Sequence, residues 1–214
     1  MDQIKTDLLK SLAGESDDIA TTRREGEQLK MKFNDGGAKF GGYTSVLESL
    51  REIIDLKMIK RSINNIKGIL VHGPSGIGKT MAIETILEEV DKHQINLIRL
   101  TPGDLVKEDD PFRKIQRTFK FVTHSAPCIL LIEEVDFLTK GKGTKDMFYG
   151  FLTELDNFTG ENSLIIATTN KIGDVDKTMR RGGRFDIDIR MDMPTSEDRH
   201  AVFKSHLEAI GHDI

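Results

Sequence analysis

The sequence predicts an α/β fold in which a parallel sheet carries helices on both faces. Two observations support this prediction. Short apolar runs alternate with segments of helical periodicity along most of the chain, as in strand and helix units joined by right-handed crossovers. In addition, residues 128–132 form a continuous apolar run, which is typical of a strand buried on both faces of a parallel sheet.

The first predicted elements surround a glycine-rich turn. A capping-box pattern at Ser45–Glu48 begins a helix, and its apolar spacing continues to Ile54. Residues 68–72 predict a strand, and residues 79–90 have helical spacing directly after the turn. Residues 95–100 predict the next strand.

The later elements continue the alternation. Asp110-Pro111 offers an N-cap and a proline suited to the first helical position, so a helix is expected to follow. Beyond the buried strand, residues 147–155 have helical spacing and residues 163–169 predict another strand. Apolar and polar residues alternate from 185 to 191, and a helical pattern begins near Thr195.

Length and composition indicate one main domain with extra segments at its ends. The chain has 214 residues, and residues 1–40 are polar and interrupted by glycines, so we expect an arm or linker without a fold of its own there. No run approaches the roughly 18 apolar residues of a membrane helix, and no secretory or transit signal is visible. We therefore expect no membrane span and a cytoplasmic or nuclear location.

Charge and cysteine content narrow the range of partners. The net charge is −4 with acids and bases interspersed, so no nucleic acid is expected as a partner. The single cysteine, Cys128, lies in an apolar run and is interpreted as a buried core thiol, which suits a reducing compartment.

The strongest motif lies between the first predicted strand and the helix after it. It fits G-x-x-x-x-G-K-[ST] and consists of Gly73, Pro74, Ser75, Gly76, Ile77, Gly78, Lys79 and Thr80. Such a loop points backbone N–H groups at phosphate oxygens, and the following helix adds the positive end of its dipole. Lys79 supplies positive charge to the β- and γ-phosphates, and the Thr80 hydroxyl can ligate Mg²⁺. A glycine-rich turn with a chance lysine is the alternative, but the context predicts a P-loop NTPase, a three-layer sandwich that binds ATP and Mg²⁺.

Two acids, Glu133 and Glu134, follow directly after the buried run, and Asp136 lies two residues further on. Carboxylates at the C-terminal end of a parallel strand lie where open α/β sheets bind ligands. One acid, Glu133, can hold the Mg²⁺ shell through water, and Glu134 can orient or deprotonate the attacking water. The alternative is a charge pair that only caps the strand.

Two further features complete the candidate site. Asn170 follows a predicted strand at the same sheet edge, where its amide could hydrogen-bond the γ-phosphate and the lytic water. Arg181 and Arg184 lie on a glycine-bearing loop, a form suited to phosphate recognition. Without this context, Asn170 would be a turn residue and the arginines solvated surface residues.

From Gly42 to about Ile210, the chain resembles the AAA family of ATPases in its motifs and in their order. The glycine-rich motif looks like Walker A, the strand that ends in two acids like Walker B, and Asn170 like sensor 1. The segment Val175–Asp186 is similar to the second region of homology, which ends in R-x-G-R-F-D.

This resemblance implies a division of the chain and an oligomer. Residues 41–194 would form the AAA large subdomain, and residues 195–214 the start of a truncated helical lid. Arg181 and Arg184 would be arginine fingers that reach the γ-phosphate held by a neighbouring subunit of a homo- or hetero-oligomer, a hexamer. The backbone near Phe40 to Tyr43, including Gly42, would contact the adenine.

Three departures from the family pattern affect the expected activity. Glu133 stands where the family usually has aspartate, so its carboxylate is one methylene longer and slower hydrolysis is expected. The segment Lys107–Phe112 is shorter and more acidic than the family's pore loop, and Phe112 lies at a predicted helix start, which counts against polypeptide threading. The chain stops at Ile214, where the lid should begin, so we expect the lid and its sensor 2 residue to be absent.

Three functions are compatible with these residues. The first is an ATP-driven motor that remodels protein complexes as a ring. The second is a nucleotide-binding regulatory or assembly subunit that hydrolyses weakly and supplies arginine fingers to a partner; Glu133, the altered pore loop and the missing lid favour it. The third, a DNA-replication loader, is opposed by the R-x-G-R-F-D ending and by the absence of a basic stripe.

Overall fold

The structure, a computed structural model, describes residues 20–31, 40–63, 65–91, 94–107, 109–139 and 144–209. Within these ranges, five parallel strands form one sheet in the order β2-β3-β4-β1-β5. The strands are β1 (Gly68–His72), β2 (Asn96–Leu100), β3 (Cys128–Ile132), β4 (Ser163–Thr169) and β5 (Ile187–Arg190). Strands β1, β3 and β4 are adjacent, so the segments that follow them meet at one edge of the sheet.

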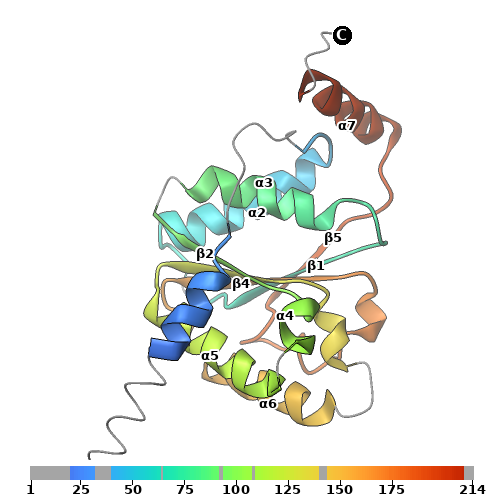
Figure 1. Cartoon of the computed structure of the whole chain (residues 1–214). Coiled ribbons are helices and arrows are strands. Elements are labelled where there is room, and N and C mark those ends of the chain that lie inside the picture. Colours follow the sequence, from blue (N-terminus) through green and yellow to red (C-terminus); the bar gives the residue numbers. More distant parts are fainter. Residues whose placement is uncertain are drawn as a thin grey trace, which may run out of the picture.

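Helices cover both faces of this sheet (Figure 1), which confirms the predicted α/β fold. On one face lie α2 (Thr44–Ile54) and α3 (Lys79–Asp91), and on the other lie α4 (Pro102–Val106), α5 (Pro111–His124) and α6 (Thr144–Asn157). The short elements η1 (Asp55–Ile59), η2 (Val135–Thr139) and η3 (Ile172–Asp174) connect them, and α7 (Ser196–Ala209) follows β5. Helix α7 buries none of its residues and stands away from the sheet.

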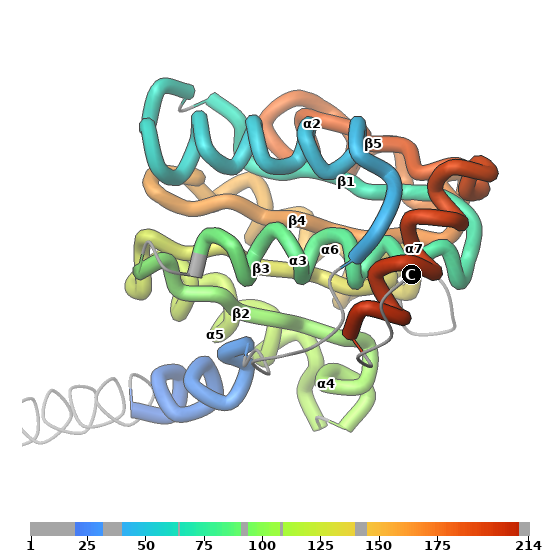
Figure 2. The backbone as a smooth tube through the Cα atoms, turned by 90° about the horizontal axis from the view of Figure 1, so that it is seen from above, coloured from blue at the N-terminus to red at the C-terminus, as the bar shows by residue number. Residues whose placement is uncertain are grey.

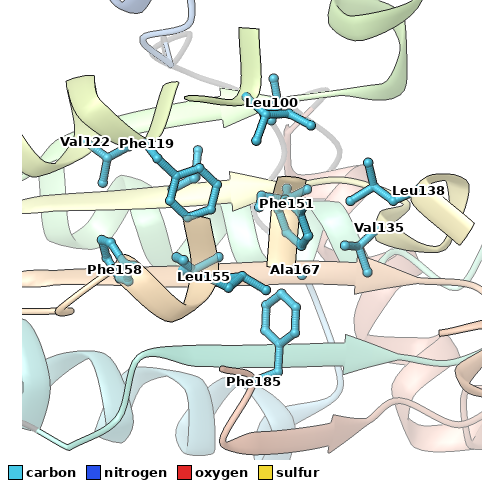
Figure 3. Close-up of a cluster of buried hydrophobic side chains, with 14 of the residues drawn as sticks. Leu100, Phe119, Val122, Val135, Leu138, Phe151, Leu155, Phe158, Ala167 and Phe185 are labelled. Carbon is cyan, nitrogen blue, oxygen red and sulfur yellow. The ribbon is translucent and has the colours of Figure 1, made fainter. Parts of the chain in front are cut away.

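The strands build two hydrophobic cores, one on each face. Along β3, Cys128, Leu130 and Ile132 enter the cluster that includes α5 and α6, whereas Ile129 and Leu131 enter the cluster that includes α2 and α3. Figure 3 shows the α5 and α6 side of this packing, with its aromatic rings close together. All five residues of β3 are buried, as the uninterrupted apolar character of this strand predicts.

Three aromatic rings join α5 to α6 inside the first cluster. The ring of Phe119 meets those of Phe151 and Phe158 edge-on, with centroids 5.8 and 6.0 Å apart. Each such pair contributes about 0.5–1.5 kcal/mol beyond the area that it buries. This packing fixes α6, the helix that precedes β4, and Asn170 directly follows that strand.

The predicted capping box at Ser45–Glu48 is wrong. Helix α2 begins at Thr44, and its N-cap is Tyr43, which has a left-handed backbone (φ 52°) and no side-chain cap. The cap is supplied from a distance, because the carboxylate of Asp198 in α7 accepts a hydrogen bond from the Tyr43 N–H at 2.6 Å. The N-cap predicted at Asp110 is confirmed, since its side chain accepts from the N–H of Arg113.

The expectation that residues 1–40 have no fold of their own does not hold for residues 20–31. Residues 20–28 are helical, and residues 29–31 pair in antiparallel fashion with the outer edge of β2 (Figure 2). The Met31 N–H donates to the Leu97 carbonyl, and the Leu29 carbonyl accepts from the Arg99 N–H, each at 2.8 Å. This pairing covers the outer edge of β2, which would otherwise be free. The polar composition of the segment alone does not reveal such pairing. Residues 1–19 and 32–39 lie outside the described residues.

Candidate nucleotide-binding site

The glycine-rich loop joins β1 to α3 at the carboxyl edge of the sheet. Gly78 has a left-handed backbone (φ 90°), and a Cβ there would lie 2.6 Å from the ring of Phe40, so glycine is required. At the start of α3, the N–H groups of Lys79 and Thr80 have no backbone partner among the described residues. These free donors and the positive end of the helix dipole fit a phosphate group.

The Lys79 ammonium lies inside this loop and reaches the end of β4. Its Nζ donates to the carbonyls of Gly73 and Pro74, at 2.8 and 2.7 Å, and to Asn170 Oδ1 at 2.8 Å. Burial lowers the pKa of Lys79, while the nearby carboxylates of Glu134 and Asp136 act in the opposite direction. The structure thus brings together the predicted Walker A lysine and the predicted sensor 1 asparagine.

Glu134 lies at the end of β3 with its side chain exposed. Its backbone is left-handed (φ 48°), and its N–H donates to Thr168 Oγ1 at 3.1 Å. A left-handed backbone costs a residue with a side chain roughly 1–3 kcal/mol, so the surrounding contacts must hold it. The turn aims the Glu134 carboxylate away from the core and toward solvent.

Glu133 has a partner that the sequence did not predict. Its half-buried carboxylate forms an ion pair with Arg99 of β2, whose guanidinium also donates from Nη1 to Glu84 Oε1 at 2.7 Å. A charged residue within the apolar run 95–100 was the available signal for Arg99.

Asp136 is buried and braces the edge next to Asn170. Its Oδ1 accepts a hydrogen bond of 2.7 Å from Thr169 Oγ1, and the Thr169 hydroxyl also accepts from the N–H of Lys171 at 3.1 Å. These contacts connect η2 to the end of β4. The backbone on each side of Asn170 is therefore fixed.

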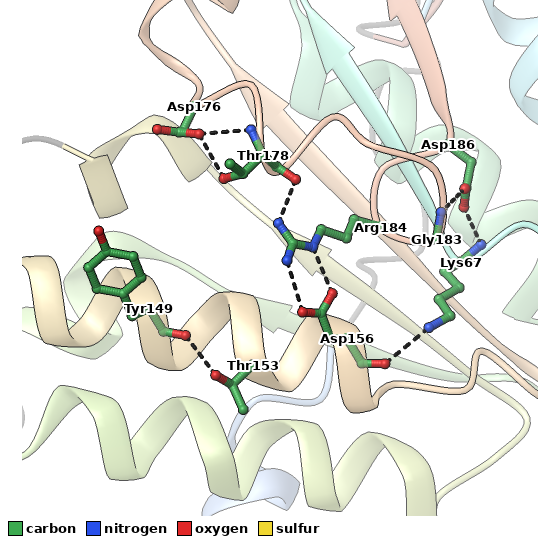
Figure 4. A network of polar contacts seen from close by, with 9 residues as sticks. All are labelled: Lys67, Tyr149, Thr153, Asp156, Asp176, Thr178, Gly183, Arg184 and Asp186. Atoms are coloured by element: carbon green, nitrogen blue, oxygen red, sulfur yellow. Dashed lines mark hydrogen bonds and ion pairs between the residues drawn. The ribbon is translucent and has the colours of Figure 1, made fainter.

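The two predicted arginine fingers differ in their surroundings. Arg184 is held by Asp156 at the end of α6 and by the Thr178 carbonyl, which accepts from Nη1 at 2.6 Å (Figure 4). The hydrogen bonds between the two side chains raise the pKa of Arg184 and lower that of Asp156. Arg181 is exposed, and its guanidinium has no hydrogen bond or ion pair within the part of the chain that the structure describes.

The glycine loop that carries these arginines is shaped by Asp186. Its carboxylate accepts from the N–H of Gly183 and from the N–H of Lys67, each at 2.7 Å (Figure 4). Gly183 has a left-handed backbone (φ 85°), and the space around it is open. The R-x-G-R-F-D pattern thus includes its own loop-closing carboxylate.

Phe40 to Tyr43, the segment that the resemblance assigns to the adenine, lie beside the glycine-rich loop. The ring of Phe40 packs over Gly78 and stacks on Tyr43 at 5.8 Å. Gly42 has φ 80° and lies against the backbone of Asp198 in α7. The Tyr43 hydroxyl donates to the Asp192 carbonyl at 2.9 Å, so the segment is anchored at two points.

The role of Asp198 was missed, although its signal was visible. Thr195 and Asp198 fit the capping-box pattern, and Thr195 Oγ1 donates to Asp198 Oδ2 at 2.9 Å. The same carboxylate accepts from the Tyr43 N–H, so one side chain caps α7 and attaches it to the segment before α2. The N–H groups of Tyr43 and Thr195 both donate to this carboxylate and lower the pKa of Asp198.

The segment at the pore-loop position has no free aromatic side chain among its described residues. Phe112 packs on α6, where a Cβ added at Gly150 would lie 2.1 Å from its ring. Val106, at the end of α4, is the exposed apolar residue of this region.

The described residues contain no group of three or more His, Cys, Asp or Glu side chains placed to hold a metal by themselves. A Mg²⁺ ion at this position would therefore need phosphate oxygens and water among its ligands, which is how proteins usually bind Mg²⁺. Among the same residues, no helix has the length and apolar character to cross a membrane.

The fold and the loop define a P-loop α/β domain. The profile of the family described as "ATPase family associated with various cellular activities (AAA)" matches residues 69–193. The chain belongs to the AAA family. Membership implies that the domain binds a nucleotide.

The relatives of the chain include proteasome-activating nucleotidases and an FtsH metalloprotease. Over 194 residues, 81% of this chain, it is 28% identical to the proteasome-activating nucleotidase of Methanoculleus marisnigri, and the match covers 46% of that protein. Over 220 residues, 94% of this chain, it is 27% identical to the protein of the same name from Methanococcus maripaludis, covering 52%. Over 219 residues, 93% of the chain, it is 26% identical to the ATP-dependent zinc metalloprotease FtsH of Ureaplasma parvum, covering 29%. The chain thus spans about half the length of these nucleotidases.

Proposed function

We propose that this domain binds ATP with Mg²⁺ and hydrolyses it, and that turnover drives the remodelling of protein complexes by a ring-shaped oligomer, a hexamer, in the cytosol or nucleus. The contact between Lys79 and Asn170 carries this proposal, with Nζ and Oδ1 2.8 Å apart. It places a cation for the β- and γ-phosphates beside an amide that can bind the γ-phosphate and a water. AAA membership supports the same reaction.

The loop residues bind and orient the triphosphate. The N–H groups at the start of α3 donate to phosphate oxygens. When the triphosphate binds, Lys79 gives up its hydrogen bonds to the carbonyls of Gly73 and Pro74 and donates to phosphate oxygens instead. Thr80 and Glu133 hold the metal shell. Bound Mg²⁺ supplies charge stabilisation to the β- and γ-phosphate oxygens. The backbone around Gly42 packs against the base.

Glu134 acts on the attacking water. Its exposed carboxylate at the end of β3 accepts the water's proton, and the hydrogen bond from its N–H to Thr168 keeps the turn in place. Asn170 orients the water from the neighbouring strand β4. Hydrolysis then needs positive charge on the γ-phosphate from outside this chain's own loop.

Arg181 and Arg184 supply that charge to a neighbouring subunit. Arg181 is already exposed, while Arg184 leaves Asp156 when it meets the neighbour's phosphate. Such arginine fingers stabilise the charge that develops in the transition state. The arrangement supports a site completed between subunits.

A second candidate is a regulatory or assembly subunit that binds ATP, hydrolyses little and lends its arginines to a partner. Two observations favour it. Glu133 has a longer side chain than the aspartate usual in the family, and Phe112 packs on α6, where it cannot grip a polypeptide.

Turnover of ATP by the unmutated chain and by Glu134→Gln separates the two. The motor requires measurable turnover that falls about 100-fold or more in the variant, because a general base contributes that much. Glu88→Gln makes the same chemical change at an exposed position of α3 and serves as the matched control. Tight ATP binding without turnover in the unmutated chain selects the regulatory subunit, and loss of turnover in both variants contradicts the role of Glu134.

A further inference from the structure

Arg99 lies on the face of the sheet that α3 covers. Side chains alternate along β2, and Leu97, two residues earlier, belongs to the core cluster that includes α3. The Arg99 guanidinium therefore projects toward α3, where its Nη1 donates to Glu84 Oε1 at 2.7 Å.

Glu133 reaches the same guanidinium from the neighbouring strand. It lies two residues beyond Leu131, which belongs to the same cluster, so its side chain continues on the α3 face. Its N–H donates to the Leu100 carbonyl at 3.0 Å, which extends the β2–β3 ladder by one residue and sets Glu133 beside Arg99. The two side chains form an ion pair through Arg99 Nε.

Glu84 connects this pair to the metal position. Thr80 and Glu84 are four residues apart in α3, so they lie on one face of the helix, one turn from each other. Arg99 thus bridges the end of β3 to the helical face that carries Thr80. The two carboxylates and one guanidinium leave one net negative charge in the cluster.

We propose that Arg99 is a positioning residue: it holds the Glu133 carboxylate toward the Thr80 face of α3, and so compensates for the extra methylene of glutamate. This inference rests on the proposed function. A glutamate has one more rotatable bond than an aspartate, and an unsupported carboxylate would have to lose that freedom when it binds the metal shell. Supporting partners of this kind orient metal ligands and tune their affinity.

The test measures binding of ATPγS by calorimetry, once with Mg²⁺ and once with EDTA. In the unmutated chain, Mg²⁺ is expected to tighten binding. In Arg99→Ala, this gain should shrink about tenfold or more, the usual effect of removing such a partner, while the affinity in EDTA stays unchanged. Arg99→Gln is measured in parallel, because it removes the charge and keeps most of the stem.

Arg51→Ala is the matched control. Arg51 also pairs with a glutamate of α3, Glu89, through contacts of 2.8 and 3.0 Å, but far along the helix from Thr80. Its loss should leave the gain from Mg²⁺ unchanged. An equal loss in Arg51→Ala and Arg99→Ala would mean that Arg99 only fastens α3 to its surroundings, and would overturn the proposal.

A double-mutant cycle separates action through Glu133 from a direct effect. With Glu133→Asp as background, Arg99→Ala should cost much less of the gain from Mg²⁺, because the shorter carboxylate does not need the support. An equal cost in both backgrounds refutes the proposal. Lys79→Ala distinguishes a failure of the proposed function from a failure of the role of Arg99. If Lys79→Ala binds ATPγS like the unmutated chain, the proposed function itself fails. If it loses binding while Arg99→Ala keeps the full gain, the role of Arg99 alone fails.

Discussion

Two parallel hydrogen bonds join Arg184 to Asp156, with Nε 2.7 Å from Oδ1 and Nη2 2.8 Å from Oδ2. Bidentate pairs of this kind are specific in geometry. Because the Asp156 side chain is 55% exposed, however, the pair contributes only about 1 kcal/mol or less to stability. A carboxylate that contributes this little can be replaced by a phosphate, so the contact is compatible with a finger that acts on a neighbouring subunit.

Replacing Asp156 with asparagine tests this exchange. Asp156→Asn should lower the free energy of unfolding by about 1 kcal/mol or less in urea denaturation. At high protein concentration it should raise ATP turnover, because the competing carboxylate charge is gone. Asp188→Asn is the matched control, since it weakens the pair with Arg180 on the same loop (2.6 Å) and leaves Arg184 alone. A fall in turnover confined to Asp156→Asn would show instead that Asp156 holds Arg184 in its working position.

The phosphate role of Lys79 predicts a change in thermal stability. ATP with Mg²⁺ should raise the thermal midpoint of the unmutated chain, because a ligand that binds the native state stabilises it by mass action. Lys79→Ala should remove most of this shift. Lys171→Ala, which removes an exposed cation next to Asn170, should keep it. Differential scanning fluorimetry measures these midpoints. A full shift in Lys79→Ala would contradict the role of Lys79 in phosphate binding.

Most of the fold could be predicted because apolar periodicity reflects burial. The run Cys128–Ile132 is buried at every position, and the strand has the predicted bounds. Residues 29–31 could not be found in this way, because their pairing with β2 uses backbone hydrogen bonds and leaves no apolar periodicity, although Leu29 also enters the core. The start of α2 was misplaced for a similar reason, since its cap comes from Asp198, far away in the sequence.

The residues of the candidate site also fall into those that the sequence located and those that it did not. Motif spacing located Lys79 and Asn170, because parallel strands present their carboxyl ends at one edge, and the structure places these side chains in contact. The partners Arg99 and Asp156 escaped prediction, since an ion pair between distant segments leaves no spacing pattern in the chain. For Glu133, the sequence showed only a longer side chain, whereas the structure shows what contacts it.

The longer side chain of Glu133 can be tested by replacing it with the shorter aspartate. Glu133→Asp should raise turnover or leave it intact, if it restores the geometry usual in the family. Glu134→Asp makes the same change at the adjacent position and should reduce turnover, because it withdraws the general base from its water. Steady-state ATPase assays compare the two. A large loss in Glu133→Asp would show that the site is built around glutamate.

Cys128 predicts a pH dependence of stability. Burial raises the pKa of its thiol from the ordinary 9.0 to about 12. The folded protein thus holds this proton more tightly than the unfolded chain. The stability that the protonated thiol contributes to the folded state is therefore complete below pH 9 and is lost as the pH rises toward 12. Between pH 8 and pH 10, the unmutated chain should lose about 1 kcal/mol of stability relative to Cys128→Ala, measured by urea denaturation. A constant difference between the two proteins would contradict the raised pKa.

The arginines of the R-x-G-R-F-D loop provide the last prediction. If Arg181 and Arg184 act on a neighbouring subunit, replacing both with alanine should leave nucleotide binding nearly intact and reduce turnover about 1,000-fold or more, since such fingers act on the transition state. Binding is measured by calorimetry and turnover by phosphate release. The matched control is the double variant of Arg180 and Arg190, two exposed arginines that pair with acids of their own chain.

Mixing variants then tests whether the arginines act in trans. The double alanine variant keeps an intact glycine-rich loop, and Lys79→Ala keeps both arginines, so a mixed oligomer contains complete sites between unlike subunits. Neither variant alone should hydrolyse ATP, whereas the mixture should regain part of the activity at high protein concentration, with assembly followed by light scattering. Mixed oligomers without rescue would exclude action across the interface. Full turnover in the double alanine variant would show that Arg181 and Arg184 are surface arginines without a role in hydrolysis.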